Sequence, residues 1–335
     1  MKKLIVLLLT VVLPLLASGQ GKIVVAYVGA GSDVIPEQSL MTHINYAFGH
    51  VNETFDGVRI SKPERLRAIV KACPDVKVCL SVGGWGSGRF SEMAADENLR
   101  RSFAQSCAQA VKEYGLAGID IDWEYPTVPA AGISSSPDDT ENFTLLMKDL
   151  REAIGPDKLL TLATSASARF IDFKAILPVI DFVNVMSYDM GRPPRHNAPL
   201  YGKDAEGNRS PIAGRMNCHA AVQAHLAAGV PASKMTMGMP FYGHGKEGYN
   251  DYVDYKDMKE PLEGYEEKWD SIACVPYYAN KEGRLVLGYD NPRSIGLKCK
   301  YIIDNDLLGG MYWEYSCDSG DLALARTVAS YLMGL

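Results

Sequence analysis

Three acidic residues alternate along one short stretch of the chain, Gly118-Ile-Asp-Ile-Asp-Trp-Glu-Tyr-Pro126. With a period of two, Asp120, Asp122 and Glu124 lie on one face of a strand. Carboxylates this close repel one another, and burial raises the cost of their charges. An enzyme can use such crowding to separate the pKa values of an acid and a base. The stretch therefore predicts a catalytic carboxylate cluster.

Two other interpretations of this stretch stay open. It could be an edge strand with a solvated acidic face, although Ile119, Ile121 and Trp123 make the opposite face strongly apolar. It could also bind calcium or magnesium through its carboxylates. Metal-binding loops usually place Gly, Asn or Asp in a turn, whereas this run of β-branched and aromatic residues favours a strand. We therefore expect no metal at this position.

The elements around the acidic strand alternate between short apolar segments and amphipathic ones. Eight strands are predicted, at residues 23–28, 43–48, 76–82, 118–125, 159–163, 181–188, 235–239 and 310–315. Helices are predicted at residues 63–73, 91–114, 140–154, 170–177, 213–228, 292–303 and 322–333. Apolar strands joined by helical crossovers imply a parallel sheet. Eight such units favour an α/β fold of the closed (β/α)8 TIM barrel type, with a doubly wound open sheet as the alternative.

One segment interrupts this alternation. Residues from about 244 to 289 are rich in Tyr, Asp, Glu and Lys, and they predict a small α+β insertion between strands seven and eight. The remainder of residues 20–335 forms the barrel.

Aromatic and polar residues gather where the predicted strands end. In a barrel of this kind the active site lies at the carboxyl ends of the strands. Flat apolar faces of sugars stack on aromatic rings, while sugar hydroxyls need fixed polar partners. Single aromatic residues at such positions often belong to the core, but their joint placement on one rim favours substrate binding. The residues are Tyr27, Phe48, Gly84, Trp85, Met186, Tyr188, Asp189, Tyr242 and Trp313.

The acidic stretch also resembles the signature of glycoside hydrolase family 18, the chitinases and endo-β-N-acetylglucosaminidases, which is Asp-x-x-Asp-x-Asp-x-Glu. Asp120, Asp122 and Glu124 match its last three acidic positions, and Ala117 departs from the first. Ala117 has the opposite parity at the start of the strand, so we expect a supporting role to be lost rather than the chemistry. Six further segments resemble family motifs in the same order: residues 81–84, 184–189, 196–201, 238–243, 289–295 and 309–313.

The resemblance implies a substrate-assisted mechanism, in which the sugar's own 2-acetamido oxygen attacks the anomeric carbon. Glu124 would be the general acid and then the base, with its pKa raised by an anionic Asp122 nearby. Asp122 would bond the acetamido N–H and stabilise the developing positive charge. Asp120 would share a proton with Asp122 and orient it. Tyr188 would donate to the acetamido oxygen.

The same resemblance implies the substrate. Asp189 and Tyr242 would contact the sugar, Trp313 would form the floor beneath its ring, and no metal or organic cofactor would be needed. The expected partner is an oligo- or polysaccharide containing N-acetylglucosamine, above all chitin and its oligosaccharides. Three alternatives stay open: an endo-β-N-acetylglucosaminidase acting on the chitobiose core of N-glycans, a non-catalytic chitooligosaccharide-binding lectin, which Ala117 would favour, and an unrelated exported barrel hydrolase.

The first 19 residues have the pattern of a secretory signal peptide. Lys2 and Lys3 precede an apolar run, and Ala17-Ser18-Gly19 forms a small-residue cleavage site before Gln20. No Cys follows the run, so a lipid anchor is not expected, and we predict a secreted or periplasmic protein. With a formal net charge of −6, the chain is a poor partner for nucleic acid or an anionic membrane. We expect a monomer.

The seven cysteines are scattered and include no Cys-x-x-Cys pair, which excludes a zinc ribbon or a thioredoxin motif. We expect most of them to be buried thiols, with room for one disulfide. The six histidines lack the spacing of a zinc protease.

Overall fold

The computed structural model describes residues 21–258 and 261–335. The predicted signal peptide, residues 1–19, and the predicted new N-terminus at Gln20 lie outside the described residues, as do residues 259–260 of the predicted insertion. Among the residues that are described, no helix combines the length and the apolar character needed to cross a membrane.

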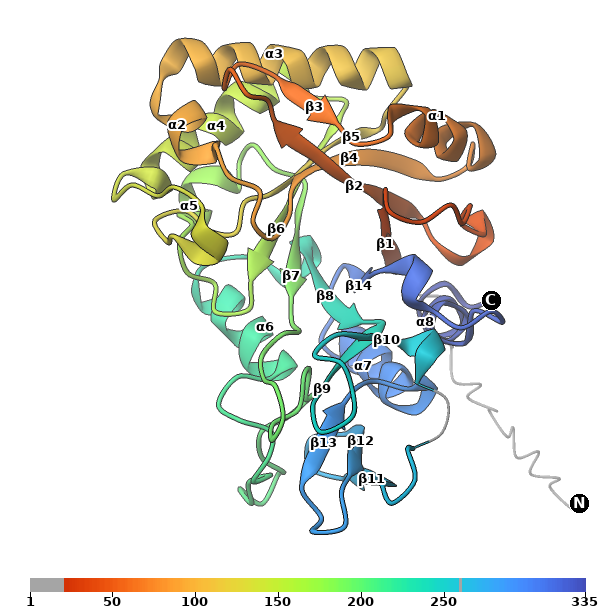
Figure 1. Ribbon diagram of the computed structural model, residues 1–335. Helices are drawn as coiled ribbons and strands as arrows, with labels where there is room; N and C mark the ends of the chain where they lie inside the picture. Colours follow the sequence, from red (N-terminus) through yellow and green to blue (C-terminus); the bar gives the residue numbers. More distant parts are fainter. Residues whose placement is uncertain (1–20, 259–260) are drawn as a thin grey trace, which may run out of the picture.

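Eight parallel strands close into a barrel (Figure 1). They are β1 (Ile23–Gly29), β2 (His43–Val51), β4 (Lys77–Gly83), β5 (Gly118–Asp122), β6 (Leu159–Ser165), β7 (Phe182–Met186), β8 (Met235–Pro240) and β14 (Gly309–Trp313). Closure is direct, because β1 pairs in parallel with β14 on one side and with β2 on the other. The predicted TIM barrel is therefore confirmed, and the alternative of an open sheet is wrong. A short β3 (Val58–Ile60) adds an antiparallel edge to β2.

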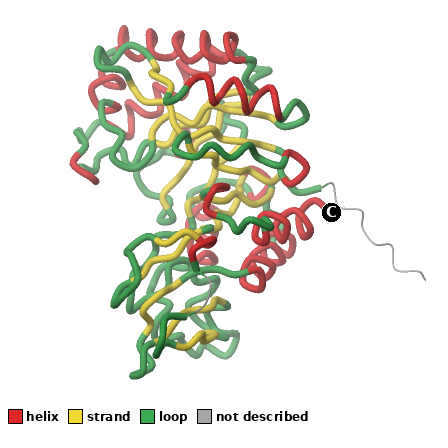
Figure 2. Tube along the Cα trace, turned by 45° about the vertical axis from the view of Figure 1, so that its right-hand side comes forward, coloured by secondary structure: helices red, strands yellow, loops and turns green. Residues whose placement is uncertain are grey.

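Helices follow the strands and cover the outside of the barrel (Figure 2). They are α1 (Pro63–Ala72), α2 (Phe90–Ala95), α3 (Glu97–Tyr114), α4 (Asp139–Ile154), α5 (Phe173–Ile176), α6 (Cys218–Ala227), α7 (Pro292–Asp304) and α8 (Ala323–Met333). The single helix predicted at 91–114 is two helices, because Asp96 is extended and its side chain caps α3 by accepting from the backbone N–H groups of Asn98 and Leu99. The helix predicted from 213 begins only after the cap at Asn217.

The insertion between β8 and α7 is an antiparallel sheet, which projects from the barrel at the end of the molecule opposite α3 in Figure 1. Its strands are β9 (Tyr242–Gly245), β10 (Val253–Asp254), β11 (Glu266–Asp270), β12 (Val275–Ala279) and β13 (Leu285–Gly288). Its described residues contain one 3-10 turn, Tyr255–Asp257, and no α-helix. The predicted α+β character is therefore wrong, because the segment's aromatic residues pack a small sheet core of their own around Tyr278 and Tyr289.

The barrel strands are buried on both faces, as a parallel sheet under helices requires. All five residues of β5 are buried, including Asp120 and Asp122. All seven cysteines are free thiols; six are buried and Cys274 is partly exposed. The expectation of buried thiols is confirmed for these six, and the disulfide for which the sequence left room does not form.

Candidate active site

A cavity of about 430 Å³ opens at the carboxyl ends of the barrel strands. Its walls come from the ends of β1, β2, β5, β7 and β14, from the loops after β4 and β7, and from the insertion. The lining residues are Tyr27, Phe48, Trp85, Asp122, Glu124, Tyr125, Met186, Tyr188, Asp189, Arg192, Tyr242, His244, Tyr252 and Trp313. The acidic strand therefore delivers two of its three carboxylates to the mouth predicted for them.

The local backbone brings β5 close to its neighbour at this mouth. Gly83, at the end of β4, has a φ of 133°, and a Cβ there would lie 1.9 Å from the carbonyl oxygen of Asp122. Only glycine permits this approach. The next residue, Gly84, donates its backbone N–H to the same carbonyl oxygen at 2.9 Å. The end of β5 is thereby fixed where Asp122 leaves the sheet, and Glu124 follows two residues beyond the strand.

Asp120 lies below the cavity, in the barrel interior, with 0 % of its surface exposed. Its carboxylate accepts four hydrogen bonds: from Tyr27 at 2.8 Å, Ser81 at 2.8 Å, Thr161 at 2.6 Å and Asn184 at 3.2 Å. Burial raises its pKa, and the four hydrogen bonds act against that rise. No described hydrogen bond joins it to Asp122, so the predicted sharing of a proton between the two is not seen in this structure.

Asp122 is also buried, but its bonding is the opposite of that of Asp120. Its Oδ1 atom is buried and has no hydrogen-bond partner among the described residues. Burial raises its pKa well above the usual value, and the charges of Glu124 and Asp120 add to the effect. A buried acceptor without a donor is expensive unless a ligand supplies one. Asp122 is therefore the group in this cavity that is most in need of a donor from outside the protein.

Glu124 has the properties of a general acid near neutral pH. Burial raises the pKa of its carboxyl to about 7; a hydrogen bond from Tyr125 acts against the rise, and the charge of Asp189 adds to it. The sequence predicted that Asp122 would be the acidic neighbour of Glu124, and the charges of these two carboxyl groups do interact; Asp189 is a second acidic neighbour that the sequence did not predict. A carboxyl group that titrates near 7 can both give and take a proton at working pH.

Aromatic rings form the rest of the barrel-side wall. Trp313 stacks on Phe48, with ring centroids 5.5 Å apart and planes at 18°, and Tyr27 packs against Trp313 at 5.8 Å. Trp85 stands at the rim with 67 % of its surface exposed. Tyr188 projects inward with its hydroxyl 3.8 Å from the Met311 sulfur, a weak acceptor that a ligand oxygen could replace. This wall offers flat apolar faces beside a few polar groups, as sugar sites do.

Another part of the cavity wall is a polar network that joins the loop after β7 to the insertion. Asp189 Oδ1 accepts from the Tyr242 hydroxyl at 2.6 Å and lies 2.7 Å from Nε2 of His244. Partial burial opposes its ionisation, but the bonds from His244 and Tyr242 lower the pKa of Asp189. Tyr252 stacks on Tyr242, with centroids 4.3 Å apart and planes at 12°. The insertion thus holds an ionised carboxylate in the same cavity as Glu124, where its charge helps to raise the pKa of Glu124.

The structure brings nearly all the predicted site residues together. All of them line the cavity except Asp120, which supports the site from below, and Gly84, which lies behind Phe48 and leaves room for its ring, since a Cβ at Gly84 would be 2.6 Å from Phe48 Cε2. Four lining residues were missed: Tyr125, Arg192, His244 and Tyr252. A signal existed for His244, because it lies two residues after Tyr242 on the same strand and therefore on the same face.

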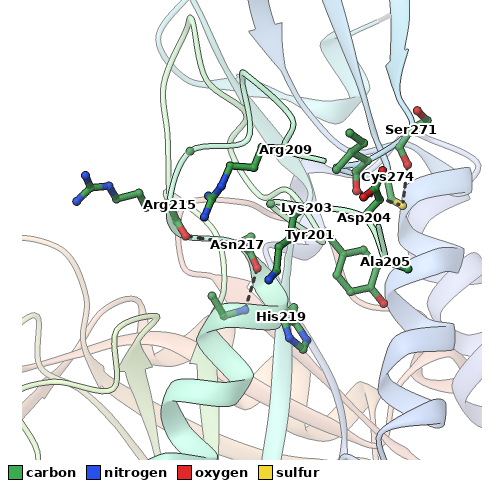
Figure 3. Close-up of a pocket in the computed structure, with 14 residues that line it drawn as sticks. Tyr201, Lys203, Asp204, Ala205, Arg209, Arg215, Asn217, His219, Ser271 and Cys274 are labelled. Atoms are coloured by element: carbon green, nitrogen blue, oxygen red, sulfur yellow. Dashed lines mark hydrogen bonds between the residues drawn. The ribbon is translucent and has the colours of Figure 1, made fainter. Parts of the chain in front are cut away.

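A second and larger cavity, of about 670 Å³, lies where the loop after β7 meets the start of α6 and the turn between β11 and β12 (Figure 3). Its lining includes Lys203, Arg209 and Arg215, and its acidic residue, Asp204, is bonded through its carboxylate to Asn208. Because it lacks paired carboxylates, it cannot support acid–base chemistry of the kind that the barrel mouth can. The carboxylate-lined cavity is therefore the candidate active site.

The metal-binding interpretation of the acidic stretch finds no geometric support. Within residues 21–258 and 261–335, no group of three or more His, Cys, Asp and Glu side chains is arranged to hold a metal ion. The carboxylate of Asp120 is surrounded by hydroxyl and amide donors instead.

Comparison with known proteins places this geometry in a family. The chain is 34% identical over 307 residues to chitinase A1 of Niallia circulans, covering 79% of this chain and 44% of that protein, so it spans less than half the length of that relative. It is 27% identical to chitinase B of Serratia marcescens, covering 88% and 77% of the two chains.

Solved structures agree with the sequence relatives. A glycoside hydrolase family 18 N-acetylglucosaminidase from Paenibacillus barengoltzii superposes with a TM-score of 0.82 at 32% identity, covering 93% of this chain and all of that one. A group IV chitinase of Ostrinia furnacalis in complex with allosamidin has a TM-score of 0.81 at 27% identity, covering 93% and 99% of the chains. The family model described as glycosyl hydrolases family 18 matches residues 22–318, and this chain, with its carboxylate-lined barrel mouth, belongs to that family.

Proposed function

We propose that the protein hydrolyses the β-1,4 linkage next to N-acetylglucosamine in chitin and chitooligosaccharides, with retention of configuration and with the substrate's acetamido group as nucleophile. Membership of family 18 supports a glycosidase, and the relatives of known activity are described as chitinases or, for the Paenibacillus protein, as an N-acetylglucosaminidase. The Ostrinia neighbour binds allosamidin in its solved complex.

The observation that carries the proposal is the unpartnered Oδ1 atom of Asp122 beside a carboxyl group that titrates near 7. A retaining enzyme with its own nucleophile needs a carboxylate free to attack the anomeric carbon. Asp122 is buried with a raised pKa, and it is two residues from the acid on the same chain segment. An acceptor in that position is suited to bind an N–H group of the substrate and to face a positive charge.

In the first step, the carbonyl oxygen of the 2-acetamido group attacks the anomeric carbon, and the bond from that carbon to the leaving oxygen breaks. Glu124 gives its proton to the leaving oxygen. The oxazolinium ring that forms carries a positive charge, which Asp122 stabilises while accepting the ring's N–H. Tyr188 donates to the acetamido oxygen and aligns it for attack, and alignment is what gives an intramolecular nucleophile its large effective concentration.

In the second step, water attacks the anomeric carbon, and the bond to the acetamido oxygen breaks. Glu124, now ionised, takes a proton from the water and returns to its starting state. Trp313 lies beneath the sugar ring as the floor of the site, and Asp189 and Tyr242 contact the sugar from the insertion side. Two displacements at one carbon leave the configuration unchanged.

The test is the variant Glu124→Gln assayed on chitohexaose. This substitution keeps the size of the side chain but removes the acidic proton, so kcat is expected to fall by at least about 10²-fold. Binding of chitohexaose, followed by Trp fluorescence, should remain. Hydrolysis at the wild-type rate would contradict the assignment, and tight binding by the wild-type protein without any product would favour a lectin instead.

Two further measurements sharpen the substrate and the mechanism. Products from chitohexaose compared with those from a high-mannose glycoprotein separate chitin cleavage from action on the N-glycan core. A thiazoline that mimics the oxazolinium ring should inhibit competitively, and glycosidase activity without such inhibition would point to an unrelated mechanism.

We also propose that the protein is exported and acts as a monomer outside the cytoplasm or in the periplasm. The basic and apolar leader followed by Ala17-Ser18-Gly19 supports export. Mass spectrometry of the protein from the culture medium or periplasm should give an N-terminus at Gln20, and retention of Met1 would contradict this. Gel filtration with light scattering tests the monomer.

A further inference from the structure

The second cavity, of about 670 Å³, differs in its chemistry from the carboxylate-lined mouth, and the two have no lining residue in common. Three cationic side chains line it, Lys203, Arg209 and Arg215, together with a single carboxylate, that of Asp204. The chain as a whole has a formal net charge of −6. An excess of cations in one cavity therefore sets this region apart from the rest of the protein.

Two of the three cations are held side by side by a small hairpin. Lys203 and Arg209 face each other in an antiparallel bridge, so their side chains lie on the same face of the hairpin. The carboxylate of Asp204 holds the turn between them, because it accepts from the backbone N–H of Asn208 at 2.7 Å and from its side-chain amide at 2.8 Å. Like charges directly opposite each other on paired strands are destabilising. The hairpin thus keeps together two charges that repel.

The two charges of the hairpin have no partner of their own in the protein. Among the described residues, no group forms an ion pair or a side-chain hydrogen bond with Lys203 or Arg209, whereas Arg192 on the same loop is paired with Asp251 at 3.0 Å. Partial burial and the charge of Lys203 lower the pKa of His219 in the same cavity, so its ring is neutral near pH 7. An anion from outside the protein would supply the missing counter-charge.

A buried amide in the same cavity adds a neutral donor. Asn217 precedes α6 with 7 % of its surface exposed, and its side-chain oxygen accepts from the backbone N–H of Ala220 at 2.8 Å. Its amide nitrogen has two N–H groups but a single contact, at 3.5 Å from the carbonyl oxygen of Arg215, which is longer than an ordinary hydrogen bond. Figure 3 shows this amide among the lining side chains, with the guanidinium of Arg215 pointing away from them. The amino-terminal end of α6 favours negative charge at the same place.

We propose that this cavity binds a phosphorylated sugar, with the phosphate group between Lys203 and Arg209. A phosphate monoester carries a charge of about −1.5 to −2 near pH 7 and has three acceptor oxygens, which match two adjacent cations and an amide donor. The cavity is far larger than a phosphate group alone. The ring of Tyr201 also lines it, and an aromatic face beside polar groups suits the sugar. This binding site is additional to the proposed glycosidase function.

The experiment is a calorimetric titration of the protein with glucose 6-phosphate at about pH 7, in a buffer of low ionic strength that contains no phosphate. One equivalent should bind with a Kd on the order of 0.1–1 mM, and glucose, which lacks the charged group, should not bind. Inorganic phosphate should bind at least about 5-fold more weakly, because it cannot contact the ring of Tyr201. No saturable binding up to about 10 mM glucose 6-phosphate would overturn the proposal, and equal affinity for inorganic phosphate would overturn the assignment of the sugar.

Variants of the hairpin test where the ligand binds. Lys203→Gln and Arg209→Gln each remove one charge, so the affinity for glucose 6-phosphate should fall at least about 10-fold. Arg209→Glu places a carboxylate opposite Lys203, so binding should be lost while thermal stability is kept or raised, because opposite charges on paired strands attract. The matched control is Arg284→Gln, in the turn between β12 and β13, where the arginine is paired with Glu282. Wild-type affinity in the Arg209 variants would overturn the proposal.

A measurement on the wild-type protein locates the anion without any variant. In crystals soaked with tungstate, a heavy analogue of phosphate, an anomalous peak should lie between Lys203 and Arg209 and should disappear when glucose 6-phosphate is added. Tungstate bound only elsewhere would overturn the proposal. Because the two cavities have no lining residue in common, binding of glucose 6-phosphate and cleavage of chitohexaose should be independent. A protein that binds the first but does not cleave the second would refute the proposed function and leave this site standing.

Discussion

The barrel interior and the cavity mouth above it each contain a buried aspartate, but the two aspartates differ in their hydrogen bonding. Asp120 in the interior accepts four hydrogen bonds, whereas Asp122, two residues later on the same strand, has a buried oxygen with no partner among the described residues. Both are buried carboxylates. The difference teaches that burial alone does not mark a functional acid in this fold. What distinguishes the mouth is a buried carboxylate oxygen without a hydrogen-bond donor, which a ligand can supply.

The same contrast extends to the groups around each carboxylate. The partners of Asp120 come from β1, β4, β6 and β7, so this one side chain ties together four strands besides its own. At the mouth, the groups are held apart across an open space, and burial raises the pKa values of Asp122 and Glu124. The interior is thus arranged for stability, and the mouth retains strain in the form of carboxylates that ionise with difficulty.

The largest expected effect comes from removing the interior carboxylate. Asp120→Ala would leave four buried donors without their acceptor, and each such group costs about 1–3 kcal/mol when it finds no substitute. Allowing for partial repair among the hydroxyls, unfolding in urea should show a loss of about 3–5 kcal/mol. Asp120→Asn keeps the shape of the side chain but turns an N–H₂ group toward donors. Its free energy of unfolding should therefore lie between those of wild type and Asp120→Ala. A loss below about 1 kcal/mol for Asp120→Ala would mean that the interior network is not a major source of stability.

Asp122→Asn tests the carboxylate at the cavity mouth. The amide oxygen can still accept an N–H, but it has no negative charge to face the oxazolinium ion, so kcat on chitohexaose should fall about 10²- to 10³-fold. Thermal stability at neutral pH should be unchanged or higher, because a neutral side chain avoids the ionisation that burial opposes. A variant that lost as much stability as Asp120→Ala would erase the distinction between the two regions.

The sequence could predict those parts of the fold and the site that depend on residues close together in the chain. The strands, the barrel and the placing of Asp120 and Asp122 on one face depend on short-range periodicity, and they were predicted. The four partners of Asp120 could not be, because they lie 39 to 93 residues away and meet only when the barrel closes. The same holds for the part that Asp189 plays in the titration of Glu124.

The insertion shows most clearly which features the sequence could not predict. Its composition predicted a departure from the barrel, but not that it would be an antiparallel sheet whose first strand, β9, turns His244 toward Asp189. The contact joins residues 55 positions apart and depends on the path of a long loop that carries no regular pattern. By contrast, the break between α2 and α3 had a local cause in the capping side chain of Asp96, a type of residue favoured at helix starts.

The smallest effect expected here concerns the stability of the mouth itself. The pKa of Glu124 is about 7 in the folded protein against an ordinary value of 4.5. Between these values the folded chain keeps a proton that the unfolded chain releases, so this group makes folding less favourable as the pH rises from about 4.5 to about 7. The Glu124→Gln variant has no carboxyl group at this position, so its free energy of unfolding does not fall for this reason. The variant should gain stability over wild type, on the order of 1–2 kcal/mol, when the comparison is moved from pH 5 to pH 8.

Thermal melts of wild type and Glu124→Gln at the two pH values measure this gain, with Glu152→Gln, which removes an exposed carboxyl group outside the cavity, as the matched control. An equal difference at pH 5 and pH 8 would mean that Glu124 ionises as easily in the fold as in the unfolded chain. In that case the mouth would hold no strained acid, and its contrast with the fully bonded interior would rest on Asp122 alone.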